Sequence, residues 1–287
     1  MLTRRDFVRS AAAVAALSSF RPLLAAPEAR WFKIGACEWS LGKSDPLSLD
    51  IAREIGLDGV QVNMGTARNN MHLRRPDVQQ AYLAAAKRTG LAIGPCLALG
   101  ELNSVPLKSD PRAAQWLAES LDVCKALGIT MTMPAFFGKG ELDMANVAEI
   151  DHVVGVLKEI APRAEKQGMT IALENYLSAA DNMTLIKRIG SPAVKVYYDV
   201  GNSTDKGYDI YAEIRQLGKL ICELHAKDGK FMLGRGRIDF KKVRAALDDA
   251  GYNGWIQIEA TRPHGLLQDY RAHYRFLRGV FPEGRKS

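Results

Sequence analysis

The chain has 287 residues, of which 47% are hydrophobic and 25% charged, and its formal net charge at pH 7 is +7. This ordinary globular composition fits two average domains or one large barrel, and it allows a sizeable core without disulfide or metal staples. The basic residues form no stripe interleaved with aromatics, so the charge does not indicate a nucleic-acid partner.

The first 26 residues predict an export signal that is not part of the fold. Residues 1–9 read M-L-T-R-R-D-F-V-R, residues 10–20 are small and apolar, and a small-residue cleavage region lies near Ala25 and Ala26. This pattern is similar to a twin-arginine signal. The apolar run is too short for a comfortable membrane span, so we expect a periplasmic or otherwise exported mature protein without one. The alternatives are a basic helical start to a cytosolic protein, or a retained anchor.

Between residues 30 and 282, short apolar runs alternate with longer amphipathic stretches. The apolar runs, read as strands, are 32–36, 59–62, 91–94, 129–133, 170–173, 194–198, 220–224 and 255–258. The clearest helix candidates, each followed by a glycine, are 76–89, 110–127, 146–167 and 239–250. Such alternation requires parallel strand pairing, because each helix returns the chain in the same direction.

Eight strand–helix units close a barrel more naturally than an open sheet, which would leave exposed edges. The prediction is therefore a single α/β domain, a (β/α)8 TIM barrel over residues 30–282, with a tail at 283–287. The competing architecture is a doubly wound nucleotide-binding sheet. It would need a glycine-rich turn after the first strand, where residues 37–42 read C-E-W-S-L-G instead.

Four consecutive predicted strands end in a residue that can bind a metal: Glu174, Asp199, His225 and Glu259. The carboxyl ends of barrel strands face the active site, so these side chains are expected to converge. Carboxylates packed together repel one another, and a divalent cation removes that penalty. Three oxygen ligands and one imidazole suit Mn2+, Mg2+ or Co2+, with Zn2+ disfavoured. Any one of these acids alone is explained equally well as a solvated loop residue or a salt-bridge partner.

Five segments then carry a resemblance to a known family. They are 172–175 (A-L-E-N), 198–202 (Y-D-V-G-N), 225–228 (H-A-K-D), 234–240 (G-R-G-R-I-D-F) and 251–259 (G-Y-N-G-W-I-Q-I-E). In order and spacing they resemble the xylose isomerase-like barrels, in particular the sugar phosphate isomerase/epimerase group that includes D-tagatose 3-epimerase-like enzymes. The resemblance covers nearly the whole predicted barrel and does not specify one substrate.

The resemblance implies a metal-dependent isomerase or epimerase acting on a sugar or sugar derivative. Glu174 and Glu259 would bind the metal and also act as acid and base. One removes a proton next to a carbonyl to give a metal-stabilised enediolate, and the other returns a proton. Asp199 and His225 would serve as ligands only.

Two positions depart from the family pattern. Asn202 stands where sugar epimerases of this group often have histidine, and Arg235 stands where an acidic residue is usual. These changes, together with the export signal, also allow a lyase acting on 3-keto-glycosides, in which proton removal expels the aglycone. Both readings share the removal of a proton α to a carbonyl.

Further residues are expected to line the substrate pocket. They are Glu38, Trp39, Gln61, Asn63, Tyr176, Asn202, Lys227 and Arg235. Lys227 is expected either to contact substrate or to brace His225, whereas Phe136, Phe137 and Tyr176 either stack on a sugar or roof the core. His72 and His264 are weaker candidates for the same pocket.

Two other functions fit the same barrel less well. A phosphodiesterase of the endonuclease IV type would need several zinc ions and many histidines, but the chain has five histidines, and His225 alone stands at a convincing ligand position. A periplasmic sugar-binding protein without catalysis is disfavoured because all four ligand candidates are present. Assembly into a homo-oligomer stays open.

Overall fold

The structure, a computed structural model, describes residues 32–283, which belong to one compact unit. These residues form a closed barrel of eight parallel strands, in the order β1 to β8, so the predicted (β/α)8 barrel is confirmed. The export signal predicted at residues 1–26 lies outside the described residues, as does nearly all of the predicted tail. Both stay predictions.

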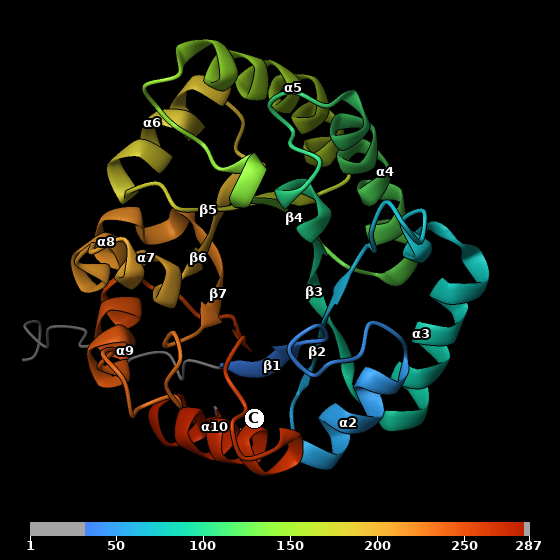
Figure 1. Cartoon of the computed structure of the whole chain (residues 1–287), viewed down its shortest axis with the longest axis vertical. Helices are drawn as coiled ribbons and strands as arrows, with labels where there is room; N and C mark the ends of the chain where they lie inside the picture. Colours follow the sequence, from blue (N-terminus) through green and yellow to red (C-terminus); the bar gives the residue numbers. More distant parts are fainter. Residues whose placement is uncertain (1–31, 284–287) are drawn as a thin grey trace, which may run out of the picture. The chain divides into compact units, whose positions relative to one another are not determined.

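The eight strands follow one another around the barrel, and helices form a ring outside them (Figure 1). The strands are β1 (Lys33–Cys37), β2 (Gly59–Asn63), β3 (Ala92–Leu99), β4 (Met131–Phe136), β5 (Thr170–Asn175), β6 (Val194–Asp199), β7 (Ile221–Ala226) and β8 (Trp255–Ile258). The helices are α2 (Leu47–Ile55), α3 (Pro76–Thr89), α4 (Pro111–Leu127), α5 (Val147–Lys166), α6 (Ala179–Ile189), α7 (Val200–Asp205), α8 (Ile210–Leu217), α9 (Phe240–Asp249) and α10 (Leu266–Val280).

Local sequence signals set the helix ends where they were expected. The Asp110 side chain accepts a hydrogen bond from the first turn of α4, and Asp239 does the same for α9. Gly90 and Gly128 end α3 and α4 in the left-handed conformation that glycine adopts without strain. Helices α3 and α4 therefore stop just before strands β3 and β4.

Strand β3 is longer than predicted, and this changes the site. The apolar run was expected to stop at residue 94, but β3 continues through Pro95 to Leu99. The register between β2 and β3 shifts across this stretch, and a proline without an N–H is tolerated at such an irregularity. The loop that follows β3 consequently starts five residues later than expected and reaches the mouth of the barrel.

The core has two parts. The larger cluster joins helix and strand residues, whereas the smaller one contains strand residues and lies inside the barrel, with Cys96, Met133 and Tyr197 among its members. The four cysteines are free, and all but the half-buried Cys222 are buried. Within residues 32–283 no helix is both long and apolar enough to cross a membrane.

Candidate metal and active site

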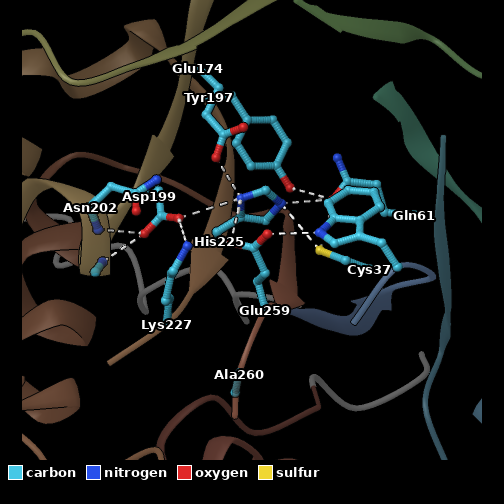
Figure 2. A network of polar contacts seen from close by, with 12 residues as sticks. Cys37, Gln61, Glu174, Tyr197, Asp199, Asn202, His225, Lys227, Glu259 and Ala260 are labelled. Atoms are coloured by element: carbon cyan, nitrogen blue, oxygen red, sulfur yellow. Dashed lines mark hydrogen bonds and ion pairs between the residues drawn. The ribbon is translucent and has the colours of Figure 1, made fainter. Parts of the chain in front are cut away.

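Three of the four predicted ligands meet inside the mouth of the barrel. Glu174 on β5, Asp199 at the end of β6 and His225 on β7 each offer a ligand atom, and these atoms all lie within 4.8 Å of one another. His225 Nδ1 is 2.7 Å from Glu174 Oε1 and 3.7 Å from Asp199 Oδ2. Figure 2 shows both carboxylates turned toward the same nitrogen of the imidazole. The neighbouring positions of the three strands thus create one buried cluster.

Asp199 has one oxygen engaged and one free. Its Oδ1 caps α7 by accepting hydrogen bonds from the N–H groups of Gly201 at 2.7 Å and Asn202 at 2.9 Å. Its Oδ2 is buried, points toward His225 and Lys227, and has no hydrogen-bond partner among the described residues. A buried carboxylate oxygen without a partner is costly. A cation at this point would remove that cost, so the residues present fit a divalent metal.

Glu259 lies one residue beyond β8, at the edge of this cluster. Its Oε1 accepts a hydrogen bond from Trp39 Nε1 at 2.7 Å, and its Oε2 accepts one from Lys227 Nζ at 2.8 Å. The same Oε2 is 3.9 Å from His225 Nδ1. Glu259 therefore faces the common centre, but both of its oxygens are held by protein groups.

Lys227 supplies positive charge beside the carboxylates. Its Nζ is 2.8 Å from Glu259 Oε2 and 3.8 Å from Asp199 Oδ2. Burial by itself would lower the pKa of Lys227, but Asp199 and Glu259 raise it well above its usual value. The ammonium therefore braces Glu259 and Asp199, rather than His225 as the alternative prediction had it.

The pKa values of the two glutamates are shifted in opposite directions. Burial raises the pKa of Glu174, although His225 opposes this. For Glu259, burial also acts upward, but the charges of His225 and Lys227 and the hydrogen bonds from Lys227 and Trp39 bring its pKa below the usual value. The site thus offers two carboxyl groups of different proton affinity, as acid–base chemistry requires.

The other side of His225 faces the barrel interior. Its Nε2 is 2.9 Å from Gln61 Oε1 and 3.3 Å from Cys37 Sγ. Burial by itself would lower the pKa of His225, but neighbouring groups, Cys37 and Glu174 first, raise it well above its usual value. Since burial raises the pKa of the Cys37 thiol to about 12, that thiol is neutral and the carboxylates are the groups that favour an imidazolium.

A cavity of about 460 Å³ opens above this cluster. It is lined by Trp39, Asn63, Gly65, Thr66, Ala98, Gly100, Glu101, Asn103, Met133, Ala135, Phe137, Glu174, Tyr176, Asn202, Lys227 and Glu259. The predicted substrate-binding residues Trp39, Asn63, Tyr176, Asn202 and Lys227 therefore lie in one pocket together with both glutamates. The aromatic rings of Phe137 and Tyr176 are 4.5 Å apart between centroids and form one wall.

Three predicted pocket residues lie elsewhere. Glu38 is fully buried and accepts hydrogen bonds from Tyr82 Oη at 2.7 Å and from the Asn63 N–H at 2.8 Å. Gln61 is also fully buried, beneath His225 rather than in the cavity. Arg235 is exposed in the loop after β7 and does not line the cavity. The positions of the strand ends indicated which residues lie near the mouth of the barrel. They did not indicate how deep each side chain lies or in which direction it points.

Phe136, His72 and His264 were also candidates for the pocket, and none of them lines the cavity. Phe136 is 1% exposed and belongs to the core, so it packs instead of stacking on a ligand. His72 and His264 do not line the cavity; His264 Nδ1 is 3.0 Å from Asp269 Oδ1.

Glu101 and Asn103 were missed as pocket residues. They belong to the short helix η2 (Gly100–Asn103), which directly follows β3. The strand prediction ended at residue 94, so these side chains were not recognised as strand-end residues. An apolar run continuing past Pro95 to Leu99 was the available signal.

Comparison with known proteins agrees with the fold. The chain belongs to the xylose isomerase-like TIM barrel family, whose model matches residues 49–280. It is 26% identical over 225 residues to the 2-epi-5-epi-valiolone 7-phosphate 2-epimerase of Actinoplanes sp., covering 75% of this chain and 82% of that protein.

Solved structures of sugar epimerases share the architecture. D-psicose 3-epimerase with D-tagatose, from Clostridium cellulolyticum H10, superposes with a TM-score of 0.72 at 20% identity, over 87% of this chain and 99% of that one. The 3-keto-D-glucoside 4-epimerase of E. coli superposes with a TM-score of 0.70 at 17% identity, over 86% and 99%. At these identities the two structures show the fold. The family match and these structures agree on the barrel, and this chain's buried Glu174, Asp199 and His225 could hold a metal.

Proposed function

We propose that this protein is a divalent-metal-dependent sugar isomerase or epimerase that removes a proton from the carbon next to a carbonyl. The observation that carries the proposal is the buried group of Glu174, Asp199 and His225. Asp199 Oδ2 has no hydrogen-bond partner among the described residues, and Glu174 lines the cavity. Glu259 stands at its edge and faces the same centre.

The donor set decides which ion fits. Glu174, Asp199 and His225 would hold the metal, with Glu259 as the fourth ligand, and this oxygen-rich set with one imidazole suits Mn2+, Mg2+ or Co2+ better than Zn2+. When bound, the ion would polarise the substrate oxygen and stabilise the negative charge that develops on proton removal.

The proton transfers fall to the two glutamates that line the cavity. One carboxylate takes the proton from the carbon beside the carbonyl, leaving an enediolate, and the other carboxyl returns a proton to the neighbouring carbon or to the opposite face. Lys227 and Trp39 hold both oxygens of Glu259 and so fix its direction.

The pocket supports a sugar-sized ligand. A volume of about 460 Å³ lies in the range of small-molecule sites. The aromatic wall offers a face for a sugar ring, and Asn63, Asn103 and Asn202 offer amides to hydroxyl groups. The names of the related epimerases favour a keto-sugar.

A lyase acting on 3-keto-glycosides is the second candidate. It uses the same proton removal, and the likeness to a 3-keto-D-glucoside 4-epimerase favours a substrate of this class. In this case the electron pair left by the proton would expel the aglycone, instead of being reprotonated at carbon.

Proton exchange in heavy water tests the proposal. The metal-loaded protein is incubated in D2O with a panel of keto-sugars and 3-keto-glycosides. We expect deuterium at one carbon next to the carbonyl, with an epimer or isomer as product, whereas a released aglycone identifies the lyase.

Glu174→Gln and Glu259→Gln should each lower exchange by about 10²- to 10⁴-fold. The exposed Glu159 on α5 gives the matched control, Glu159→Gln, which should leave exchange unchanged. If Glu259→Gln retains full turnover, the acid–base assignment is wrong.

Export by the twin-arginine route remains part of the proposal, supported by the arginine pair and the apolar run of residues 1–26. Replacing Arg4 and Arg5 together by lysine should keep the protein in the cytoplasmic fraction of the producing cell. Unchanged export of the double variant would contradict this route.

A further inference from the structure

The buried side of His225 is held by a set of hydrogen bonds that the proposed chemistry does not use. His225 Nε2 is 2.9 Å from Gln61 Oε1, whereas Nδ1 is the atom that faces Glu174, Asp199 and Glu259 (Figure 2). The two ring nitrogens thus face opposite surroundings. The partner of Nε2 decides which nitrogen carries the proton in the neutral ring.

Gln61 offers an acceptor to this nitrogen. Its Oε1 also lies 3.0 Å from Tyr197 Oη and 3.3 Å from Cys37 Sγ, and both of these groups donate to it. Its amide nitrogen lies 3.6 Å from Met133 Sδ, a weak acceptor. If the amide were flipped, its oxygen would face the Met133 sulfur, which has no proton to donate. Its N–H groups would then face Tyr197 Oη and Cys37 Sγ, which are themselves donors in this contact. An amide oxygen only accepts, so His225 Nε2 is the donor in this contact.

The position of Gln61 excludes direct contact with a ligand in the cavity. It is fully buried on β2, beneath the site, and does not line the cavity, so it does not touch a bound sugar. A buried polar side chain is retained at a cost unless its hydrogen bonds serve the fold or the site. Here its carbonyl oxygen joins three strands, β1, β6 and β7, under the metal-binding nitrogen.

We propose that Gln61 is a positioning residue that keeps the proton of His225 on Nε2 and so presents the Nδ1 lone pair to the metal. Tyr197 and Cys37 hold the Gln61 amide in the accepting orientation. This inference rests on the metal site proposed above and deepens it. Partners behind a ligating histidine fix its tautomer and ring orientation, and their loss costs about 10- to 100-fold in metal affinity.

Metal titration of matched variants tests the role. The full chain is stripped with a chelator and titrated with Mn2+ by calorimetry. Gln61→Met keeps the length of the side chain but removes the acceptor, and we expect the Mn2+ Kd to rise about 10- to 100-fold. Gln61→Glu restores an acceptor oxygen and should bring the Kd back to within about 3-fold of the wild type. Tyr197→Phe removes one donor to Gln61 and leaves the contact with Nε2, so its Kd should also stay within about 3-fold.

A spectroscopic readout on the unmodified protein keeps the inference testable if Gln61→Met does not fold. Long-range 1H–15N spectra of the Mg2+-loaded chain report the tautomer of His225, whose signals are identified by their loss in His225→Gln. We expect the proton on Nε2 and the metal on Nδ1.

The outcomes separate this inference from the proposed function. Unchanged Mn2+ affinity in folded Gln61→Met overturns the role of Gln61 and leaves the metal site standing. A proton on Nδ1 of the metal-loaded chain overturns both the role of Gln61 and the assignment of His225 as a ligand, because Nδ1 is the nitrogen that faces Glu174 and Asp199. Failure of the wild-type chain to bind Mn2+, Mg2+ or Co2+ overturns both.

Discussion

Two neighbouring layers inside the barrel contain buried carboxyl groups, and they differ in how the charge is handled. At the mouth, Glu259 is kept ionised by Lys227 and His225. One layer deeper, Glu223 on β7 is fully buried, and its Oε1 accepts a hydrogen bond from Gln257 Nε2 at 2.6 Å. Burial raises the pKa of Glu223 to about 8, so it carries a proton at neutral pH.

The comparison of Glu259 with Glu223 shows what keeps a buried carboxyl group ionised. A carboxyl group with an amide as its partner stays neutral, because desolvation outweighs one hydrogen bond. The mouth instead combines several acids with a lysine and an imidazole, and Asp199 Oδ2 lies 3.7 Å from His225 Nδ1 and 3.8 Å from Lys227 Nζ. The deeper layer therefore behaves as a polar part of the core, whereas the mouth brings together three residues that could hold a metal ion.

The largest expected contrast is in turnover. Asp199→Asn keeps an oxygen that can cap α7 but removes the charge that would bind the metal, so activity should fall by about 10³-fold, or about 4 kcal/mol of barrier. Glu223→Gln, one layer deeper, should change activity by less than about 3-fold. Steady-state rates on the substrate found by heavy-water exchange check this pair. Equal losses in both variants would erase the distinction between the layers.

Metal dependence of stability gives the next largest effect. At about 100 times its Kd, Mn2+ should raise the free energy of unfolding by about 2.7 kcal/mol, because it binds the folded state. Urea unfolding with and without chelator should show this gain in the wild type and in Glu223→Gln. Asp199→Asn serves as the negative control, and a full gain in that variant would show that the ion binds elsewhere.

Lys227→Met tests the counter-charge at the mouth. Removing the ammonium leaves Glu259 and Asp199 without their cation in the metal-free protein, and Lys227 is 28% exposed, so solvent reduces the penalty. We expect a loss of about 2 kcal/mol in metal-free urea unfolding, most of it recovered on adding Mn2+. An unchanged metal-free stability would mean that the lysine does not balance these carboxylates.

The smallest effect, counted per pH unit, is a pH dependence from buried neutral carboxyl groups. The pKa of Glu38 is raised by burial from its ordinary value of 4.5 to about 8 in the folded protein. The folded state therefore holds this proton more tightly than the unfolded state does. Its contribution to stability is complete below pH 4.5 and is lost as the pH rises toward 8.

Glu38→Gln should remove up to about 1.4 kcal/mol per pH unit from the slope of unfolding free energy between pH 5.5 and 7.5. Glu223→Gln should flatten the same interval, since its pKa is also raised to about 8. Urea midpoints at three pH values measure both slopes. A slope identical to that of the wild type in both variants would show that these groups titrate normally.

Much of the fold followed from local rules. Apolar runs, helix caps such as Asp110 and stop glycines such as Gly128 gave the strand–helix alternation, and that alternation requires parallel pairing. Strand β3 was misjudged because an apolar run interrupted by Pro95 reads locally as a strand end, whereas tertiary pairing with β2 and β4 carries it on to Leu99. Glu101 and Asn103 were missed for the same reason.

For the site, the sequence by itself determined which residues stand at the ends of strands β5 to β8, and so which chemistry meets at the mouth. Only the tertiary structure decided how deep each side chain lies. Gln61 and Asn63 point the same way from β2, yet one supports His225 from below and the other lines the cavity. The depth of a side chain in the barrel follows from the stagger of the strands around it. That stagger depends on contacts between distant segments, so the sequence of a single strand does not predict it.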